Sequence, residues 1–230
     1  MPCEVMGIVN VTPDSFSDGG RFFSPVEAVR RARNMLAEGA AIIDIGGEST
    51  RPGATPIGWR EEWARIEQVV GELAGTCRLS VDTYHPETAE KALRAGAQLI
   101  NCVREESVRE MRALVASFAG AELIAPARAI GEGEDLSRIY LDPMIGFGTT
   151  REEDLALVRG LGELCRRGRV AVGVSRKRIV KKLTGEKLTG KNLGGGLALA
   201  LWCAEAGASI VRVHDVRETV QAIRTWNSLR

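Results

Sequence analysis

Short apolar segments rich in β-branched residues alternate along the chain with longer amphipathic segments. The apolar segments span residues 5–11, 40–46, 79–82, 99–103, 122–125, 138–141, 170–174 and 210–213. Helical patterns lie between them, at residues 25–39, 59–74, 86–95, 105–118, 152–167, 193–206 and 219–229. Strands that alternate with helices form parallel sheets, because a parallel neighbour requires a long crossover connection. The pattern therefore predicts an α/β fold built from about eight β-α units.

About eight such units favour a closed (β/α)8 TIM barrel, formed as a single domain by residues 1–230. An open, doubly wound sheet is the alternative that the same pattern allows. The connection between the fifth and sixth strands, residues 126–137, is near the minimum length for a crossover and contains Pro126, Gly131 and Gly133. We predict that the fifth crossover helix is absent or reduced to a turn. An apolar barrel wall left uncovered there would suit a subunit interface, which favours a homodimer.

The composition is that of a soluble globular protein and excludes several classes. The 230 residues carry a net charge of +1, with 44% hydrophobic and 27% charged residues. A balanced charge gives no indication of nucleic acid or a membrane surface as partner, and no apolar segment reaches transmembrane length. The five cysteines include no CxxC pair and are interpreted as core residues of a reduced, cytoplasmic protein.

Polar side chains stand at or near the carboxyl end of nearly every predicted strand. They are Asn10, Asp44, Asp82, Asn101, Asp142, the group Ser175, Arg176 and Lys177 after the seventh strand, and Arg212 and His214 at the eighth. In a parallel barrel these strand ends meet on one face. Any one of these residues could simply stabilise a loop. Seven strands would not all carry the cost of a buried polar group without a function, so the set predicts a single site.

The groups in this set are of two chemical kinds. The first kind supplies acceptors and amides that suit the NH and C=O edges of a flat heterocycle: Asp44, Asp82, Asn101 and Asp142. The second kind supplies donors and positive charge that suit a phosphate or carboxylate: Asn10, Thr50, Arg51, Lys177, Arg212 and His214. Together they indicate an amide-like ring that bears a phosphate leaving group.

Several common sites are disfavoured by the sequence. There is no HExxH, GxSxG or GxxxxGK[ST] motif, and only two histidines, His85 and His214, so a multi-histidine metal site is excluded. His85 precedes Pro86 in a predicted turn and is interpreted as structural. The loops at residues 12–23 and 48–59 exceed the usual length of about 2–6 residues for such connections and are predicted to act as lids.

Several of these segments resemble the signatures of the dihydropteroate synthase family. Residues 6–20, which read MGIVNVTPDSFSDGG, are similar to the first signature, and residues 44–53, DIGGESTRPG, to the second. Shorter matches at residues 80–83, 142–148, 175–177 and 212–216 follow in the family's order. The resemblance implies a TIM barrel that condenses 6-hydroxymethyl-7,8-dihydropterin pyrophosphate with p-aminobenzoate, releasing pyrophosphate, in folate biosynthesis.

The resemblance also implies roles for individual residues. The pterin ring would contact Asp44, Asp82, Asn101, Asp142, Phe147 and Lys177. The pyrophosphate would contact Asn10, Arg212 and His214, with Asn10 also a ligand of Mg2+. The p-aminobenzoate pocket would include Thr50, Arg51, Pro52 and Ser175. The residues implied in catalysis are Asp82, Lys177, Arg212 and His214.

The chain departs from the family in the middle of the barrel. Cys102 follows Asn101 where the family usually has aspartate, and Met144 stands where it usually has glycine. The fifth strand also differs, and its crossover helix is missing. Two alternatives follow: a pterin-binding paralogue that is non-catalytic or uses an altered substrate, and a pterin-dependent methyltransferase acting on a corrinoid protein. Those methyltransferases lack the loop that residues 12–20 form here.

Overall fold

The computed structural model describes residues 3–12, 24–49, 54–188 and 190–229. Eight strands pair in parallel in the order β6-β5-β4-β3-β2-β1-β8-β7. They are β1 (Glu4–Asn10), β2 (Ile42–Gly46), β3 (Arg78–Asp82), β4 (Leu99–Asn101), β5 (Glu122–Pro126), β6 (Ile139–Asp142), β7 (Ala171–Gly173) and β8 (Ile210–Val213). A bridge between Leu141 and Val170 brings the two outer strands together. The sheet thus closes on itself, and the predicted TIM barrel is confirmed.

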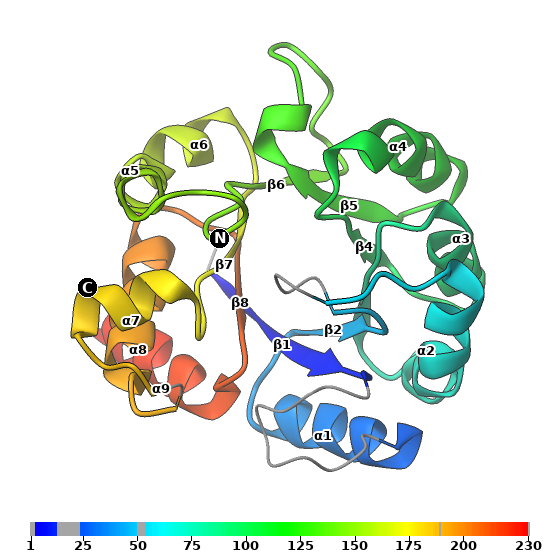
Figure 1. Cartoon of the computed structure of the whole chain (residues 1–230), viewed down its shortest axis with the longest axis horizontal. Coiled ribbons are helices and arrows are strands. Elements are labelled where there is room, and N and C mark those ends of the chain that lie inside the picture. The colour runs from blue at the N-terminus through cyan, green and yellow to red at the C-terminus, as the bar shows by residue number, and fades with distance from the viewer. Residues whose placement is uncertain (1–2, 13–23, 50–53, 189, 230) are drawn as a thin grey trace.

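The helices surround the barrel (Figure 1). They are α1 (Pro25–Ala37), α2 (Trp59–Leu73), α3 (Pro86–Arg94), α4 (Val108–Ser117), α5 (Arg151–Arg159), α6 (Leu161–Arg167), α7 (Arg178–Thr184), α8 (Leu193–Glu205) and α9 (Val216–Ser228), and the short 3-10 turn η2 (Glu105–Ser107) precedes α4. The helix predicted at residues 152–167 is divided at Gly160, which ends α5. In the part of the chain described, no helix is both long and apolar enough to cross a membrane.

The fifth crossover contains one short 3-10 turn, η3 (Ala127–Ala129), so the predicted loss of its helix is confirmed. The expectation of an uncovered apolar wall at this place is wrong. Ile130 is buried and Leu136 packs against the main core, so the crossover itself covers the strands. The surface it presents is polar, with Glu132 and Asp135 exposed.

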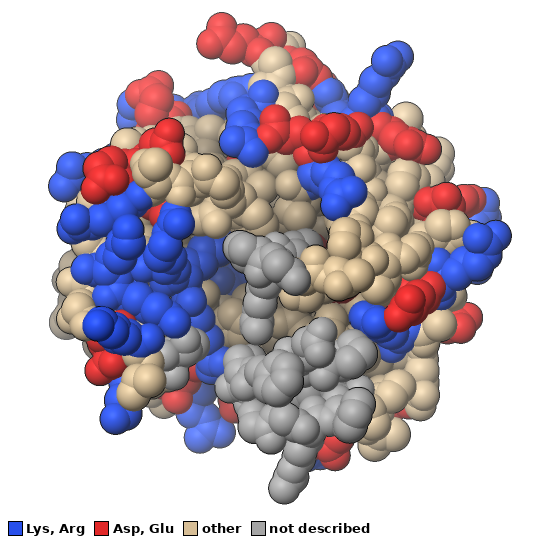
Figure 2. All heavy atoms as spheres, viewed as in Figure 1, with Lys and Arg blue, Asp and Glu red and all other residues tan. Residues whose placement is uncertain are grey.

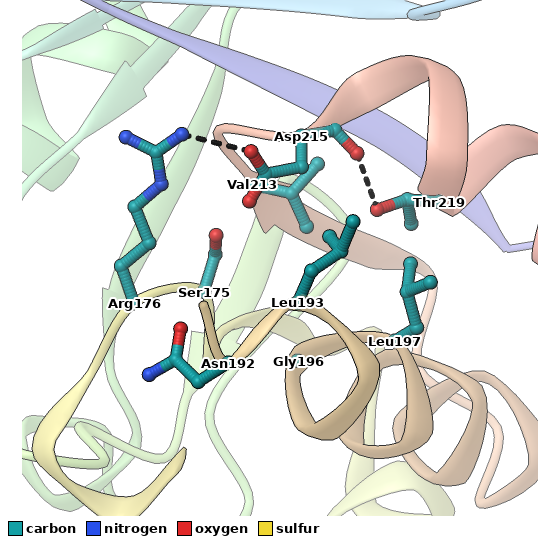
Figure 3. Close-up of a pocket in the computed structure, with 9 residues that line it drawn as sticks. All are labelled: Ser175, Arg176, Asn192, Leu193, Gly196, Leu197, Val213, Asp215 and Thr219. Carbon is teal, nitrogen blue, oxygen red and sulfur yellow. Dashed lines mark hydrogen bonds and ion pairs between the residues drawn. The ribbon is translucent and has the colours of Figure 1, made fainter. Parts of the chain in front are cut away.

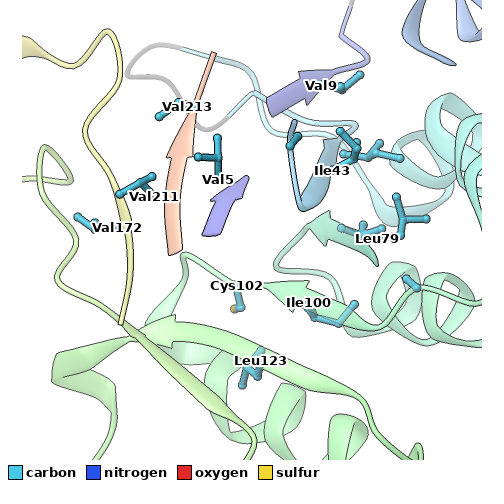
Figure 4. Close-up of a cluster of buried hydrophobic side chains, with 14 of the residues drawn as sticks. Val5, Val9, Ile43, Leu79, Ile100, Cys102, Leu123, Val172, Val211 and Val213 are labelled. Carbon is cyan, nitrogen blue, oxygen red and sulfur yellow. The ribbon is translucent and has the colours of Figure 1, made fainter. Parts of the chain in front are cut away.

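Side chains alternate between the two faces of each strand and so form two separate apolar clusters. The outward set packs under the helices and includes Val5, Val9, Ile43, Leu79, Ile100, Leu123, Val172, Val211 and Val213 (Figure 4). The inward set fills the middle of the barrel and comprises Met6, Ile42, Leu99, Ile124, Tyr140, Ala171 and Ile210. Because Asp44 follows Ile42 by two residues, and Arg212 follows Ile210 by two, both side chains point into the barrel.

Charged groups close the amino-terminal end of the barrel, below the inward apolar cluster. Arg78 donates hydrogen bonds to Glu4 at 2.8 Å and to Glu122 at 2.5 Å, and Arg169 donates to Glu122 at 2.5 Å. Both arginines also donate to the Tyr140 hydroxyl, at 2.9 and 3.1 Å. Charges removed from water are tolerated when they are paired in this way. The barrel interior therefore has a charged floor, an apolar middle and a polar upper layer, in which the predicted site residues lie.

Candidate active site

The ends of β2, β3, β4 and β8 carry one hydrogen-bonded cluster. Arg212 donates from Nε to Asp44 at 2.5 Å and from Nη2 to Asp82 at 2.6 Å. Asn101 donates to Asp44 at 3.1 Å, and Ser80, to which the sequence analysis assigned no role, donates to the other Asp44 oxygen at 2.5 Å. The Asp44 side chain is 0% exposed, whereas that of Asp82 is 13% exposed. Asp44 therefore holds Arg212 in place, and Asp82 is the carboxylate that reaches the mouth of the barrel.

A second group of predicted residues lies at the ends of β6 and β7. The Lys177 ammonium donates to the Ile145 carbonyl at 2.5 Å and lies 4.5 Å from the centroid of the Phe147 ring. Asp142 accepts a hydrogen bond from the Met144 N–H at 2.7 Å. Lys177 and Asp142 interact electrostatically, and Lys177 interacts with Arg212 as well. The two groups thus belong to one polar layer at the carboxyl end of the barrel.

Met144 has a backbone φ of 61°, in the left-handed region that favours glycine. The cost of this conformation for a residue with a Cβ is about 1–2 kcal/mol. The family resemblance led us to expect glycine here, and the structure offers a physical reason: the turn directs the Met144 N–H at Asp142. This chain keeps the turn, and with it the orientation of Asp142, despite the larger side chain.

The ends of β7 and β8 place His214, expected at the pyrophosphate, against Ser175, expected in the p-aminobenzoate pocket, while Asn10 lies at the end of β1. His214 Nδ1 lies 3.2 Å from Ser175 Oγ, which also accepts a hydrogen bond from the His214 N–H at 3.2 Å. Asn10 pairs with Gly46 in the sheet, and a Cβ built on Gly46 would lie 3.4 Å from Asn10 Oδ1. The side-chain oxygen of Asn10 is therefore beside the end of β2, near Asp82. The predicted residues Thr50, Arg51 and Pro52 lie outside the described residues, as does most of the first long loop.

Burial shifts the pKa values of the charged groups in this layer. Burial raises the pKa of Asp82 to about 7; Arg212 partly offsets this effect, and the neighbouring carboxylates add to it. Burial also raises the pKa of Asp142, against the opposing effect of Lys177. The pKa of Lys177 is lowered to about 8 by burial, with Asp142 opposing. Groups that titrate near neutral pH in such a buried polar layer are candidates for proton exchange with a bound ring.

A further polar network, which the sequence did not indicate, supports the loop after β2. Tyr84 donates to Glu48 at 2.5 Å, and His85 Nε2 lies 3.3 Å from the same carboxylate. Thr83 donates at 2.7 Å to the buried carboxylate of Glu62, whose pKa is raised by burial. The network ties the loop after β2 to the loop after β3, consistent with the structural role predicted for His85. A signal existed: Glu48 lies within the signature at residues 44–53, and Tyr84 directly follows the matched segment at residues 80–83.

The closed parallel barrel, with a polar layer at the carboxyl ends of its strands, has the architecture of a barrel enzyme. The family model described as pterin binding enzyme matches residues 6–129 and 125–214. The chain therefore belongs to the pterin-binding enzymes.

Full-length relatives narrow this assignment. The dihydropteroate synthase of Neisseria meningitidis serogroup C is 38% identical over 261 residues, covering 98% of this chain and 92% of the relative. The solved structure of Xanthomonas albilineans dihydropteroate synthase with 4-aminobenzoic acid has a TM-score of 0.86 at 36% identity, covering 99% of this chain and 93% of that one. That of Yersinia pestis dihydropteroate synthase with a sulfonamide drug complex has a TM-score of 0.89 at 34% identity, covering 100% and 94%. Within the pterin-binding enzymes, the chain is a member of the dihydropteroate synthase family.

Proposed function

We propose that this enzyme condenses 6-hydroxymethyl-7,8-dihydropterin pyrophosphate with p-aminobenzoate and releases pyrophosphate, a step of folate biosynthesis. The observation that carries the proposal is the cluster in which Arg212 joins Asp44 and Asp82 beside Lys177 and Asp142. It combines acceptors for a heterocycle with cations for a diphosphate. Relatives in the family have been solved with 4-aminobenzoic acid and with 7,8-dihydropteroate, a substrate and the product of this reaction.

In the proposed reaction, the C–O bond between the pterin methylene carbon and the diphosphate breaks, and a C–N bond to the arylamine forms. The ring is held by Asp82, Asn101, Asp142 and Lys177, with Phe147 beside it. Arg212 and His214 bind the departing diphosphate, whose negative charge grows as the C–O bond breaks. The arylamine nitrogen loses one proton once it is bonded to carbon. It requires positioning more than a strong base.

We propose Mg2+ as the cofactor, with Asn10 as its protein ligand. No group of three or more His, Cys, Asp or Glu residues that could hold a metal occurs in the described ranges. A single side-chain oxygen still fits Mg2+, because this ion is commonly bound by substrate phosphates and water with few protein ligands. When bound, it would neutralise charge on the leaving diphosphate.

The proposed function predicts pyrophosphate release that requires both substrates and Mg2+. EDTA should stop release, and added Mg2+ should restore it. Asn10→Ala should raise the Mg2+ concentration for half-maximal rate about tenfold or more, the effect of losing about 1.4 kcal/mol of binding. A coupled pyrophosphate assay measures all three. Calorimetric binding of the pterin pyrophosphate without any release would instead support the non-catalytic paralogue, and methyl transfer to a corrinoid protein would support the methyltransferase.

We also propose that the enzyme is a homodimer that uses α8. This helix is largely apolar, yet within it only Ala200 and Cys203 are buried, and Trp202 is 53% exposed. Leu183 and Leu188, in and after α7, are exposed as well. A second copy would bury this apolar face. In sedimentation equilibrium, Trp202→Glu should convert a dimer to a monomer, whereas Val26→Glu on α1 should not. A monomeric parent protein would refute the proposal.

We place the reaction in the cytoplasm. All five cysteines are free thiols, which suits a reducing compartment.

A further inference from the structure

Lys177 lies between two arginines, Arg176 and Arg178, where β7 connects to α7. Arg176 is paired at 2.8 Å with Asp215, which follows β8 (Figure 3). Arg178 is paired at 3.5 Å with Asp154, which belongs to α5. The two chain neighbours of Lys177 are thus held by carboxylates from different elements. Neither carboxylate has a role in the proposed reaction.

Asp154 is a buried carboxylate to which the sequence analysis assigned no role. It lies in the first turn of α5, it is fully buried, and its Oδ2 has no hydrogen bond among the described residues. Glu152 and Glu153 are exposed in the same turn and already supply the negative charge that a helix N-terminus favours. The ion pair with Arg178 compensates weakly, because the Arg178 side chain is half-exposed. Burial of a carboxylate is costly, so the stability of α5 does not explain Asp154.

The other oxygen of Asp154 holds the loop after β6. Asp154 Oδ1 accepts a hydrogen bond from the Gly146 N–H at 2.7 Å and another from the Thr149 hydroxyl at 2.5 Å. The Gly146 N–H also donates to Thr149 Oγ1 at 3.1 Å, and the Thr149 carbonyl accepts from Arg178. Asp154 therefore fastens this loop to α5 and, through Arg178, to the start of α7.

The same loop lies against the Lys177 side chain. The Ile145 carbonyl, which accepts from the Lys177 ammonium at 2.5 Å, directly precedes Gly146. A Cβ on Gly146 would lie 3.3 Å from Lys177 Cδ, so the loop backbone passes close to the aliphatic part of this side chain. Gly146 has a φ of 80°, in the left-handed region that glycine adopts without strain. The position of the Lys177 ammonium therefore depends on a loop that Asp154 holds.

The charge of Asp154 also acts on Lys177. Burial lowers the pKa of Lys177 to about 8, and Asp142 and, more weakly, Asp154 oppose this effect. The surface around Lys177 is basic: Figure 2 shows lysines and arginines gathered over α7, whose last turn contains Lys181 and Lys182. Nearby cations favour loss of a proton from a lysine, so a buried carboxylate on the α5 side helps to keep Lys177 charged.

We propose that Asp154 is a positioning residue for Lys177. It fixes the loop at residues 145–149 and the start of α7, the two segments between which the Lys177 ammonium is held. The proposal rests on the proposed function, in which Lys177 holds the pterin ring, and Asp154 acts only through Lys177. Loss of the acceptor at residue 154 should therefore weaken pterin binding although every group that contacts the ring is still present.

Calorimetric titration with the pterin pyrophosphate, in the absence of p-aminobenzoate, tests the role of Asp154. Asp154→Leu removes the acceptor that holds the loop and should weaken binding by about tenfold or more. Asp154→Asn keeps an oxygen that can accept from the Gly146 N–H, so its affinity should stay within about threefold of that of the parent protein. Glu152→Leu, a comparable change at an exposed position of the same turn, is the matched control and should leave binding unchanged.

A double-mutant cycle distinguishes this role from a general loss of stability. Lys177→Met should itself weaken pterin binding, and Asp154→Leu added to it should weaken binding by less than about threefold more, because a residue that acts through Lys177 then has no side chain left to position. A further tenfold loss in the Lys177→Met protein, of about the size seen in the parent, would overturn the proposal. So would an Asp154→Asn protein that binds as weakly as Asp154→Leu. If Asp154→Leu fails to fold, Thr149→Val removes one donor to Asp154 and replaces it in the cycle, with an expected loss of about threefold.

The titrations also separate the positioning role from the proposed function. Unchanged affinity after Asp154→Leu, beside a weakened Lys177→Met protein, would refute only the role of Asp154. Unchanged affinity after Lys177→Met would refute the pterin site of the proposed function, and the positioning role with it. Because no turnover is measured, a protein that binds the pterin in this manner but fails to condense it with p-aminobenzoate would refute the proposed reaction and not the role of Asp154.

Discussion

Arg212→Met is expected to abolish pyrophosphate release and to lower the free energy of unfolding by about 3–5 kcal/mol, the usual effect of removing one partner of a buried ion pair. The physical reason is that Arg212 is bonded to two carboxylates, Asp44 at 2.5 Å and Asp82 at 2.6 Å. Without the guanidinium, two carboxylates remain close together in the barrel with no cation between them. Urea unfolding at pH 8 and the pyrophosphate assay measure the two effects.

The destabilisation should depend on pH with a definite sign. Burial already raises the pKa of Asp82 to about 7 from the model-peptide value of 3.8, and loss of Arg212 raises it further. A carboxyl group whose folded pKa is raised contributes stability below its unfolded pKa and loses it as pH rises through the folded pKa. The Arg212→Met penalty should therefore be smaller at pH 5.5 than at pH 8.

Two controls make this prediction specific. Arg30→Met removes an exposed ion pair with Glu27 and should change the free energy of unfolding by less than about 1 kcal/mol. Asp44→Asn in the Arg212→Met protein removes one of the two carboxylates and should restore part of the lost stability. If the Arg212→Met variant were as stable as the parent protein at pH 8, the ion pairs of Arg212 with Asp44 and Asp82 would not be what stabilises the polar layer.

The barrel and the end of it that carries the site were predictable because both depend on local patterns. Ile43 and Ile45 face the helices and Asp44 faces inward, as period-two alternation in a strand requires. The same rule places Asp82 and Arg212 inside the barrel at the carboxyl ends of their strands. Short apolar segments separated by amphipathic ones were sufficient to predict parallel strands whose carboxyl ends share one face, and the pairing order with the bridge between Leu141 and Val170 decides for the closed barrel over the open sheet.

Local patterns did not predict α7 or the partners of the site residues. Helix α7 has only seven residues, three of them basic, so it is too short to show the apolar periodicity of a longer amphipathic helix. The bond between Arg212 and Asp44 joins residues 168 positions apart, and only the closed barrel brings them together. The sequence analysis therefore assigned Arg212 a role toward the diphosphate, and its function as the cation of the inner cluster became visible only in the structure.

The structure shows that the departure from the family sequence at Cys102 lies outside the inner polar cluster. The sequence indicated an altered wall of the pterin pocket, because similar enzymes usually have aspartate at this position. In the structure Cys102 is buried in the main hydrophobic cluster under the helices, and its Sγ faces the Arg104 carbonyl at 3.4 Å (Figure 4). Burial raises the pKa of its thiol to about 11, so it is neutral. Asn101 and Asp82 keep their positions in the inner cluster, which weakens the argument for a non-catalytic paralogue.

Lys177→Met is expected to have opposite effects on activity and stability. Lys177 lies at the Phe147 ring and interacts with Asp142 and Arg212, so its removal takes a cation from the proposed pterin site, and we expect kcat/KM to fall by about 10²–10³-fold. Burial of this charged group also destabilises the folded protein, because burial lowers the pKa of Lys177 from 10.5 to about 8. Replacing it with an apolar side chain should raise the free energy of unfolding at pH 7 by roughly 1–3 kcal/mol, after allowing for the lost bond to the Ile145 carbonyl.

The pH dependence of this gain distinguishes relief of a buried charge from better packing. Between the folded pKa of about 8 and the unfolded value of 10.5, the unfolded chain binds more protons at Lys177, so the parent protein gains stability from this group as pH rises. The advantage of Lys177→Met should therefore be largest below pH 8 and disappear near pH 10.5. Lys182→Met on the exposed side of α7 is the matched control and should show no such dependence. A stability gain that does not change with pH would mean that packing, and not the charge, is responsible. A loss of stability at pH 7 would mean that the interactions of Lys177 with Asp142 and the Ile145 carbonyl outweigh the cost of its burial. The Lys177 cation would then stabilise the folded protein as well as the bound substrate.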